Sequence, residues 1–318
     1  MSLYLLKRTA SFLLTLLAAS VVVFAVLALL PGTVADVMLG ESATAESRAA
    51  LTAKLGLDAP APTRYGRWVL GLLHGDMGQS VSYEAPVAGL IAERLQVTAP
   101  LAAMAMALAT VLALALGLYA ASRHNQTGDV SVMALSQLGI AVPNFWFGVL
   151  LVLVFSVKLQ WFSAGGFPGW HDEDGGGAWP AVKALILPAV ALAVVQAAIL
   201  ARITRSAVLD VLREDFVRTA RAKGMPESQV RWRHVLRNAL IPVVTIIGLQ
   251  LPRLVGGAAV TETIFSWPGM GRLGVEAALS RDYPLIMAIT LFVAVAVVAF
   301  NLIVDLIYPL LDPRIQLE

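Results

Sequence analysis

Nine basic residues lie between positions 202 and 237, and only four acidic residues oppose them. The centre of this cluster is the segment 218–242, RTARAKGMPESQVRWRHVLRNALIP, which separates two long apolar runs. Gly224 marks the end of one helix and Pro226 the start of the next, because glycine suits the residue after a helix and proline its first turn. Guanidinium and ammonium groups at this density bind acidic groups or lipid phosphates. The segment indicates a helix–turn–helix that projects from a membrane and is held by a soluble partner.

A second group of polar residues lies inside the apolar runs. Gln250, Arg253 and Gly257 share one helical face, and Arg253 falls about 18 Å from the cytoplasmic start of its run. A charge near mid-bilayer is costly and therefore suggests a function. Arg253 could contact the carboxylate of a passing ligand, or it could form a structural ion pair or snorkel outward. Asn144 is a further candidate to line a pathway, although an interhelical hydrogen bond is the alternative.

The sequence gives little support for disulfide, metal-binding, ATP-hydrolysing or other catalytic chemistry in this chain. The absence of cysteine excludes disulfides, haem attachment and thiolate metal sites. The acidic turn 171–174 is interpreted as flexible and solvated, so no metal site is predicted. The chain has no G-x-x-x-x-G-K-[ST] phosphate loop and so is not expected to hydrolyse ATP itself. An intramembrane enzyme would need a catalytic cluster within the crossings, yet all four histidines fall in loops or at helix ends: His74, His124, His171 and His234.

The elements that carry these residues are membrane helices. With 58% hydrophobic and 14% charged residues and a mean hydropathy of +0.77, the chain is not an ordinary soluble domain. A crossing needs about 20 apolar residues, and polar alternation typical of barrel strands is absent. We predict an all-α polytopic membrane protein with six transmembrane helices, the third and sixth long enough to tilt or kink, with Pro143 kinking the third. The predicted crossings are 9–30, 96–121, 131–160, 183–203, 239–261 and 284–310.

Charge distribution predicts the orientation. The basic 202–237 region should be cytoplasmic by the positive-inside rule, and six crossings then place both termini in the cytoplasm. The first run is too long for a signal-peptide core and is followed by Pro31-Gly32, so we expect an uncleaved helix rather than a cleaved signal.

Two segments should face the outer side. Residues 31–95 are predicted to form a small helical cap, with helices over 45–55 and 65–73 and a third that Pro86 opens. The 262–283 loop mixes apolar residues with Gly-Pro punctuation and should dip back toward the bundle as a scoop. Whether it gates the pathway or only plugs the outer end stays open. The candidate gate residues are Glu262, Phe265, Trp267 and Pro268.

Several stretches resemble one family in the expected order. RTARAKGMPESQVRWRHVLRNALIPVV resembles the cytoplasmic EAA loop of ABC-importer permeases of the dipeptide, oligopeptide and nickel branch. LGLDAPAPTRYGRWVLGLLHGDMGQS, AVPNFWFGVLL, VTETIFSWPGMGRL and NLIVDLIYPLLDPRI are similar to the same branch. Arg218-Thr219-Ala220 stands where the general family has Glu-Ala-Ala, and Arg237 replaces the usual first proline while Pro242 is retained. Both departures are common in the peptide branch.

The resemblance implies a type I ABC-importer permease fold. Its parts would be the first helix with the N-terminus (1–30), the outer cap (31–95), a five-helix core (96–310) with coupling loop 209–237, and a cytoplasmic tail (311–318). The turn between the two short helices would sit in a groove of an ATPase subunit. The residues implied for this coupling are Thr219, Ala220, Lys223, Gly224, Met225, Pro226 and Glu227.

The resemblance further implies partners in a bacterial inner membrane. These are a homologous second permease, two ABC ATPases that bind ATP and Mg, and an extracytoplasmic solute-binding protein, with the lipid bilayer around them and no nucleic acid. No cofactor is expected on this chain. The alternative function, a secondary transporter or channel driven by ion gradients, would need paired repeats or a buried carboxylate relay. The cargo stays open among dipeptides, oligopeptides, glutathione, nickel and metallophore complexes, as does the choice between hetero- and homodimer.

Overall fold

The computed structural model describes residues 2–29, 39, 44–54 and 56–311. Regular secondary structure in this part is helical, apart from one isolated bridge between Gln79 and Pro86, so the all-α prediction is confirmed. The predicted tail, from 312 onward, and most of 30–43 lie outside the described residues. The helices are α1 Ser2–Leu29, α3 Ala45–Lys54, α4 Ala61–Leu73, α5 Val87–Ser122, α6 Thr127–Ala141, α7 Asn144–Leu151, η2 Val152–Lys158, η3 Asp172–Asp174, α8 Ala178–Val211, α9 Asp215–Ala222, α10 Glu227–Gln229, η4 Val230–Leu236, α11 Arg237–Gly257, α12 Ala259–Ile264, α13 Met270–Leu279 and α14 Tyr283–Leu311.

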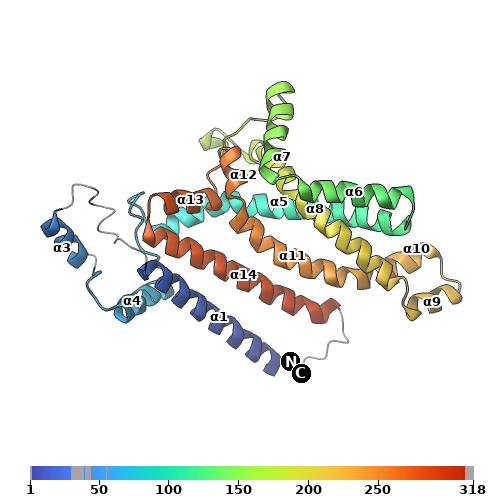
Figure 1. Cartoon of the computed structure of the whole chain (residues 1–318), viewed down its shortest axis with the longest axis horizontal. Helices are drawn as coiled ribbons and strands as arrows, with labels where there is room; N and C mark the ends of the chain where they lie inside the picture. The colour runs from blue at the N-terminus through green and yellow to red at the C-terminus, as the bar shows by residue number, and fades with distance from the viewer. Residues whose placement is uncertain (1, 30–38, 40–43, 55, 312–318) are drawn as a thin grey trace.

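The long helices form an elongated bundle, with α9 and α10 at one end and α13 and α4 toward the other (Figure 1). In the described part of the chain, 5 helices are long and apolar enough to cross a membrane. The bent pair formed by α6 with α7 and η2 raises the number to 6 if it is one span. The six-crossing prediction agrees with this upper number.

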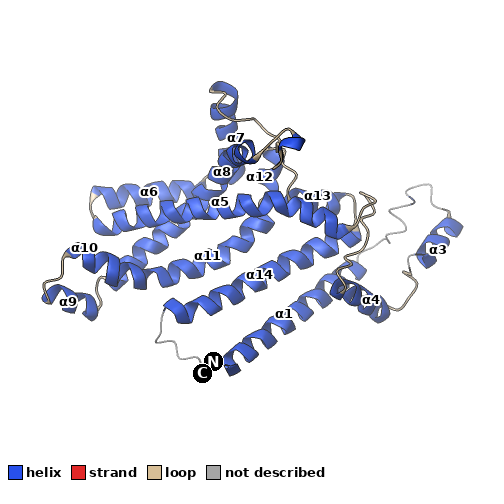
Figure 2. Cartoon of the chain, turned by 180° about the vertical axis from the view of Figure 1, so that it is seen from behind, coloured by secondary structure: helices blue, strands red, loops and turns tan. Residues whose placement is uncertain are grey.

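The third predicted crossing is sharply bent at its proline. Residues Thr127–Ala141 and Asn144–Lys158 meet at 97°. Val142 and Pro143 both have extended backbone, because proline disfavours helical geometry in the residue before it. The kink predicted at Pro143 is confirmed, and it turns α7 away from the bundle (Figures 1 and 2).

The centre of the bundle is the α5–α8 pair, which packs more extensively than any other pair of described helices. Small residues allow this close approach, among them Ala109 of α5 and Ala197 of α8, both buried. At Gly117 an added Cβ would lie 2.6 Å from Thr204 Cβ, so the backbones nearly touch there. α11 packs on both α8 and α14, and α1 packs on α14. An ion pair of 2.7 Å joins Arg8 Nη2 to Asp305 Oδ1 between those two outer helices.

The outer segment contains the predicted helices α3 and α4. Tyr65 of α4 lies with its hydroxyl 2.8 Å from Ser20 Oγ of α1, and Arg64 stacks over the Phe24 ring of α1. The helix that begins after Pro86 differs from the sequence interpretation. It does not end near Arg94 but continues as α5 to Ser122, and Pro100 lies inside this helix.

Candidate functional site

The turn at Gly224 is a defined helix ending. α9 stops at Ala222, and Gly224 follows with φ +75°. The Gly224 N–H donates to Arg221 O at 2.9 Å and the Met225 N–H to Ala220 O at 3.3 Å. This pair of hydrogen bonds is the Schellman motif, which favours glycine at the left-handed position. Pro226 then precedes α10, so both punctuation residues lie where the sequence predicted them.

A salt bridge closes the turn from outside. Arg221 Nη2 donates to Glu227 Oε1 at 2.8 Å and Arg221 Nε to Glu227 Oε2 at 3.1 Å. The hydrogen bonds to Glu227 raise the pKa of Arg221 further above its usual value. This bidentate contact joins the last turn of α9 to the first residue of α10 at the surface.

The underside of the turn is packed onto the bundle. Val217 and Ala220 of α9 are buried together with Val208 of α8 and with Val230 and Val235 of η4. This apolar cluster packs the turn directly against α8 and η4.

The predicted coupling residues divide between the two faces of the turn. Ala220 is buried and Met225 is half-buried, so both face the bundle. Thr219, Lys223, Gly224, Pro226 and Glu227 are exposed.

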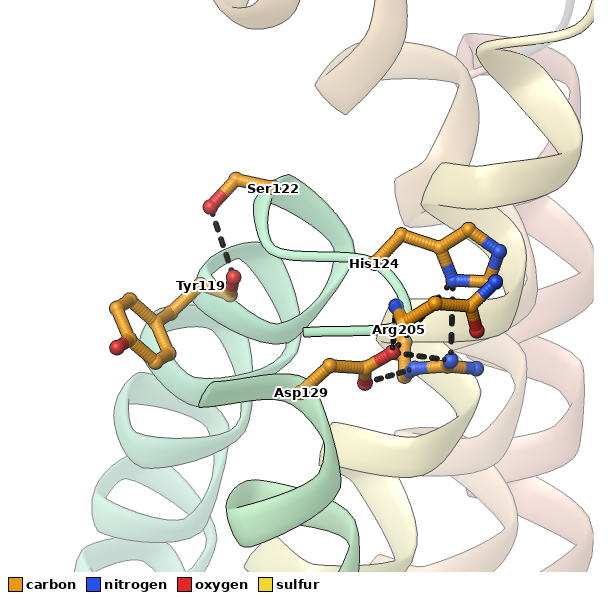
Figure 3. A network of polar contacts seen from close by, with 6 residues as sticks. Tyr119, Ser122, His124, Asp129 and Arg205 are labelled. Carbon is orange, nitrogen blue, oxygen red and sulfur yellow. Dashed lines mark hydrogen bonds and ion pairs between the residues drawn. The ribbon is translucent and has the colours of Figure 1, made fainter. Parts of the chain in front are cut away.

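A buried ion pair near the same end was missed by the sequence analysis (Figure 3). Asp129, at the start of α6, is buried and accepts two hydrogen bonds from the Arg205 guanidinium of α8, the longer at 2.6 Å. The backbone N–H of Asn125 donates to Asp129 Oδ2 at 2.9 Å, and His124 Nδ1 lies 3.2 Å from Arg205 Nη2. The network fastens the α5–α6 turn to α8. An acidic residue at the edge of an apolar run was the available signal.

The outer loop after α11 is held by a buried carboxylate. Glu262 of α12 is 1% exposed. Its Oε1 accepts from Thr98 Oγ1 at 2.7 Å and its Oε2 from the Arg272 N–H at 2.9 Å. The Met270 N–H donates to Thr98 Oγ1 at 2.8 Å. Glu262 and Thr98 therefore satisfy the first N–H groups of α13, where a negative charge is also favoured by the helix dipole.

The remaining predicted gate residues are packed in the same place. Phe265 and Trp267 are 2% and 1% exposed, whereas Pro268 is half-buried. The rings of Trp267 and Phe167 lie 5.2 Å apart, and the Gly166 N–H donates to Phe265 O at 2.9 Å. The loop thus packs against the 161–170 segment at this end of the bundle.

The predicted pathway residues are only partly described. Gln250 of α11 is 6% exposed, and its Oε1 has no hydrogen-bond partner in the described part of the chain. Asn144 is half-buried at the first position of α7, just past the bend. The side chain of Arg253 and the surroundings of Gly257 lie outside the described residues, so their shared face remains a prediction.

The whole chain matches two family models. Residues 113–317 match the binding-protein-dependent transport system inner membrane component, and residues 1–113 match the N-terminal component of the same system. The chain belongs to this family. The permease is thus an integral membrane subunit of an ABC importer and not an enzyme, as the resemblance implied.

Relatives match the permease from end to end. It is 40% identical to the oligopeptide transport system permease protein AppB of Bacillus subtilis over 317 residues, which cover 99% of this chain and 100% of that protein. It is also 40% identical to the glutathione transport system permease protein GsiC of Salmonella paratyphi A over 313 residues, 98% of each chain. A solved structure of the MetNI methionine ABC transporter is similar in fold, with a TM-score of 0.53 at 19% identity, over 69% of this chain and 96% of that chain.

Proposed function

We propose that the permease forms the translocation path for peptides, or for a related small ligand such as glutathione, nickel or a metallophore complex. A solute-binding protein would deliver the cargo on the outer side. The printed names of the full-length relatives, which include oligopeptide, dipeptide and glutathione permeases, support this cargo class. A homologous second permease would complete the path, and two ATPase subunits would bind ATP and Mg.

The proposed coupling step is supported by one observation: the Gly224 turn is exposed, and its underside packs on α8 and η4. Its outward residues Thr219, Lys223, Gly224, Pro226 and Glu227 would contact the ATPase, and Ala220 and Met225 would anchor the turn from beneath. Because the underside packs on α8 and η4, closure of the ATPases would move those helices as a body and open the outer gate. This orientation places the turn and both termini in the cytoplasm of a bacterial cell.

The outer loop with Glu262, Phe265, Trp267 and Pro268 would act as the gate. Glu262, Phe265 and Trp267 are buried in the described conformation, so opening a path at this position would require the loop to move. Gln250, Arg253, Gly257 and Asn144 are proposed to line the path behind it. The amide oxygen of Gln250 supports this assignment, since it is buried without a partner among the residues that the structure describes, which is unusual for an acceptor.

The test is extraction of the tagged chain from its own cells in mild detergent, with mass spectrometry of the co-purified proteins. We expect a second permease, two ATPases and a solute-binding protein. Uptake of radiolabelled trialanine by the same cells should require ATP. Recovery of the chain alone, with transport in ATP-free vesicles under an ion gradient, would contradict the proposal.

A further inference from the structure

A small polar pocket of about 320 Å³ lies on the outer side between the start of α5, the 161–170 segment and α13. Two arginines line it, Arg94 of α5 and Arg272 of α13, together with the carboxylate of Glu276 and the hydroxyl-bearing Ser266. Phe167, Pro268 and Leu273 supply apolar wall. None of the four polar residues was singled out by the sequence analysis.

The charged side chains that line this pocket are two arginines and one glutamate. Glu276 accepts a hydrogen bond from Arg272 Nε at 2.7 Å and another from the Tyr83 hydroxyl at 2.7 Å. Burial opposes ionisation, but the hydrogen bonds from Tyr83 and Arg272 prevail, and the pKa of Glu276 lies below its usual value. Glu276 is therefore ionised at neutral pH. A second carboxylate near Arg94, that of Glu262, is already engaged by the Thr98 hydroxyl and the Arg272 N–H.

Arg94 is the second guanidinium of the pocket, and it lies close enough to Glu276 and Glu262 to interact with both electrostatically. Its Nε is buried and has no hydrogen-bond partner in the described part of the chain. A buried donor left unpaired costs about 1–3 kcal/mol, so in native proteins such a group commonly marks a site filled by something else. The first N–H groups of α13 do not supply this site, since Glu262 and Thr98 already occupy them. The pocket's attraction for an anion thus comes from the arginine side chains.

The backbone at the pocket is strained on one side. Ser266 has φ +53°, in the left-handed region that a residue with a Cβ seldom adopts. Such strain is held at a cost and is commonest where a side chain or a ligand contact depends on it. Ser266 lines the pocket together with the two arginines.

We propose that this pocket binds the terminal carboxylate of a peptide as it arrives at the outer end of the permease. The volume is at the lower limit of ligand sites, about 300 Å³, and suits one amino-acid end rather than a whole peptide. Guanidinium groups pair with carboxylates in bidentate geometry, and the apolar wall accepts the last side chain. The assignment rests on the proposed peptide transport, which it deepens by naming the end of the cargo that the permease contacts.

The test compares trialanine with its C-terminal amide. Binding to the co-purified transporter complex, stripped of binding protein, is measured by saturation-transfer NMR. The wild-type complex should bind the free acid at least about tenfold more tightly than the amide, as one charge-assisted contact predicts. Arg94→Gln should lose this preference, and Arg94→Lys should retain part of it. Arg281→Gln serves as the matched control, because Arg281 is exposed at the α13–α14 turn and does not line the pocket.

The outcomes separate this inference from the proposed function. Equal binding of acid and amide by the wild type, or an unchanged preference in Arg94→Gln, would overturn the carboxylate site. If the preference for the free acid appeared only when binding protein was present, the binding protein and not the pocket would recognise the carboxylate. That result would also overturn the carboxylate site. If wild-type cells did not take up trialanine, that result would instead count against peptide transport, even if the pocket bound carboxylates in vitro. Co-elution of all subunits in each variant shows that the complex remains assembled.

Discussion

The two loops that the sequence marked for function are built in opposite ways. On the outer side, Glu262 is 1% exposed and holds the start of α13 from the interior. On the cytoplasmic side, the Glu227 side chain is 47% exposed and pairs with Arg221 at the surface. When a loop moves, a buried polar group must exchange its protein partners for new ones. An exposed ion pair within a loop can instead keep its partners and move with the loop. Under the proposed function, the loop that carries Glu262 would switch between discrete states, and the Gly224 turn would transmit force from the ATPase.

The strongest test of this contrast removes the buried carboxylate. Glu262→Ala leaves the Thr98 hydroxyl and the Arg272 N–H without their acceptor, and we expect a loss of about 3 kcal/mol in stability from two charge-assisted hydrogen bonds. Thermal unfolding of the detergent-extracted complex measures it. Glu93→Ala, which removes an exposed carboxylate from α5, should change little. Similar stability of the two variants would show that the buried contact does not hold the loop.

The next test asks whether the loss of stability on removing a carboxylate depends on its burial and not on which end of the bundle it occupies. Asp129 is buried at the cytoplasmic end, and its partner Arg205 has a side chain 22% exposed. Removing one member of a buried pair costs about 3–5 kcal/mol, and the partial exposure of Arg205 reduces our expectation to about 2 kcal/mol for Asp129→Asn. Asp210→Asn, at an exposed position of α8, is the control. If Asp129→Asn were as stable as that control, the network in Figure 3 would not fasten α6 to α8.

These two carboxylates also show what the sequence could and could not predict. Gly224 and Pro226 were predictable because the Schellman turn is made by residues within six positions of each other. The Thr98–Glu262 and Asp129–Arg205 contacts join residues 164 and 76 positions apart, and no local pattern encodes such a partner. The bend at Pro143 was predictable, but its size of 97° depends on what α7 packs against, namely α8 and α12.

At the Gly224 turn, we expect the effect of a substitution to depend on the backbone conformation of residue 224 and not on side-chain contacts. A Cβ at Gly224 would meet nothing within 4 Å, so substitution costs only backbone strain at φ +75°. Gly224→Val should lose about 1–2 kcal/mol locally, distort the turn and reduce ATP-driven uptake about tenfold with normal membrane levels. Gly224→Asn should keep most uptake, because asparagine tolerates left-handed backbone. Equal uptake by the two variants would mean that the shape of this turn does not limit coupling.

The smallest effect is expected at the surface salt bridge. The Arg221 and Glu227 side chains are 42% and 47% exposed, so solvent and salt screen the pair and a double-mutant cycle should give a coupling energy of about 0.5 kcal/mol. The cycle uses Arg221→Gln and Glu227→Gln, with unfolding of the extracted complex measured at low and high salt. The Arg218–Asp215 pair, at 3.4 Å and more exposed, is the control and should show no measurable coupling. A coupling energy of 2 kcal/mol or more would mean that the cytoplasmic turn is also held by a strong polar contact, and the contrast between the two loops would then fail.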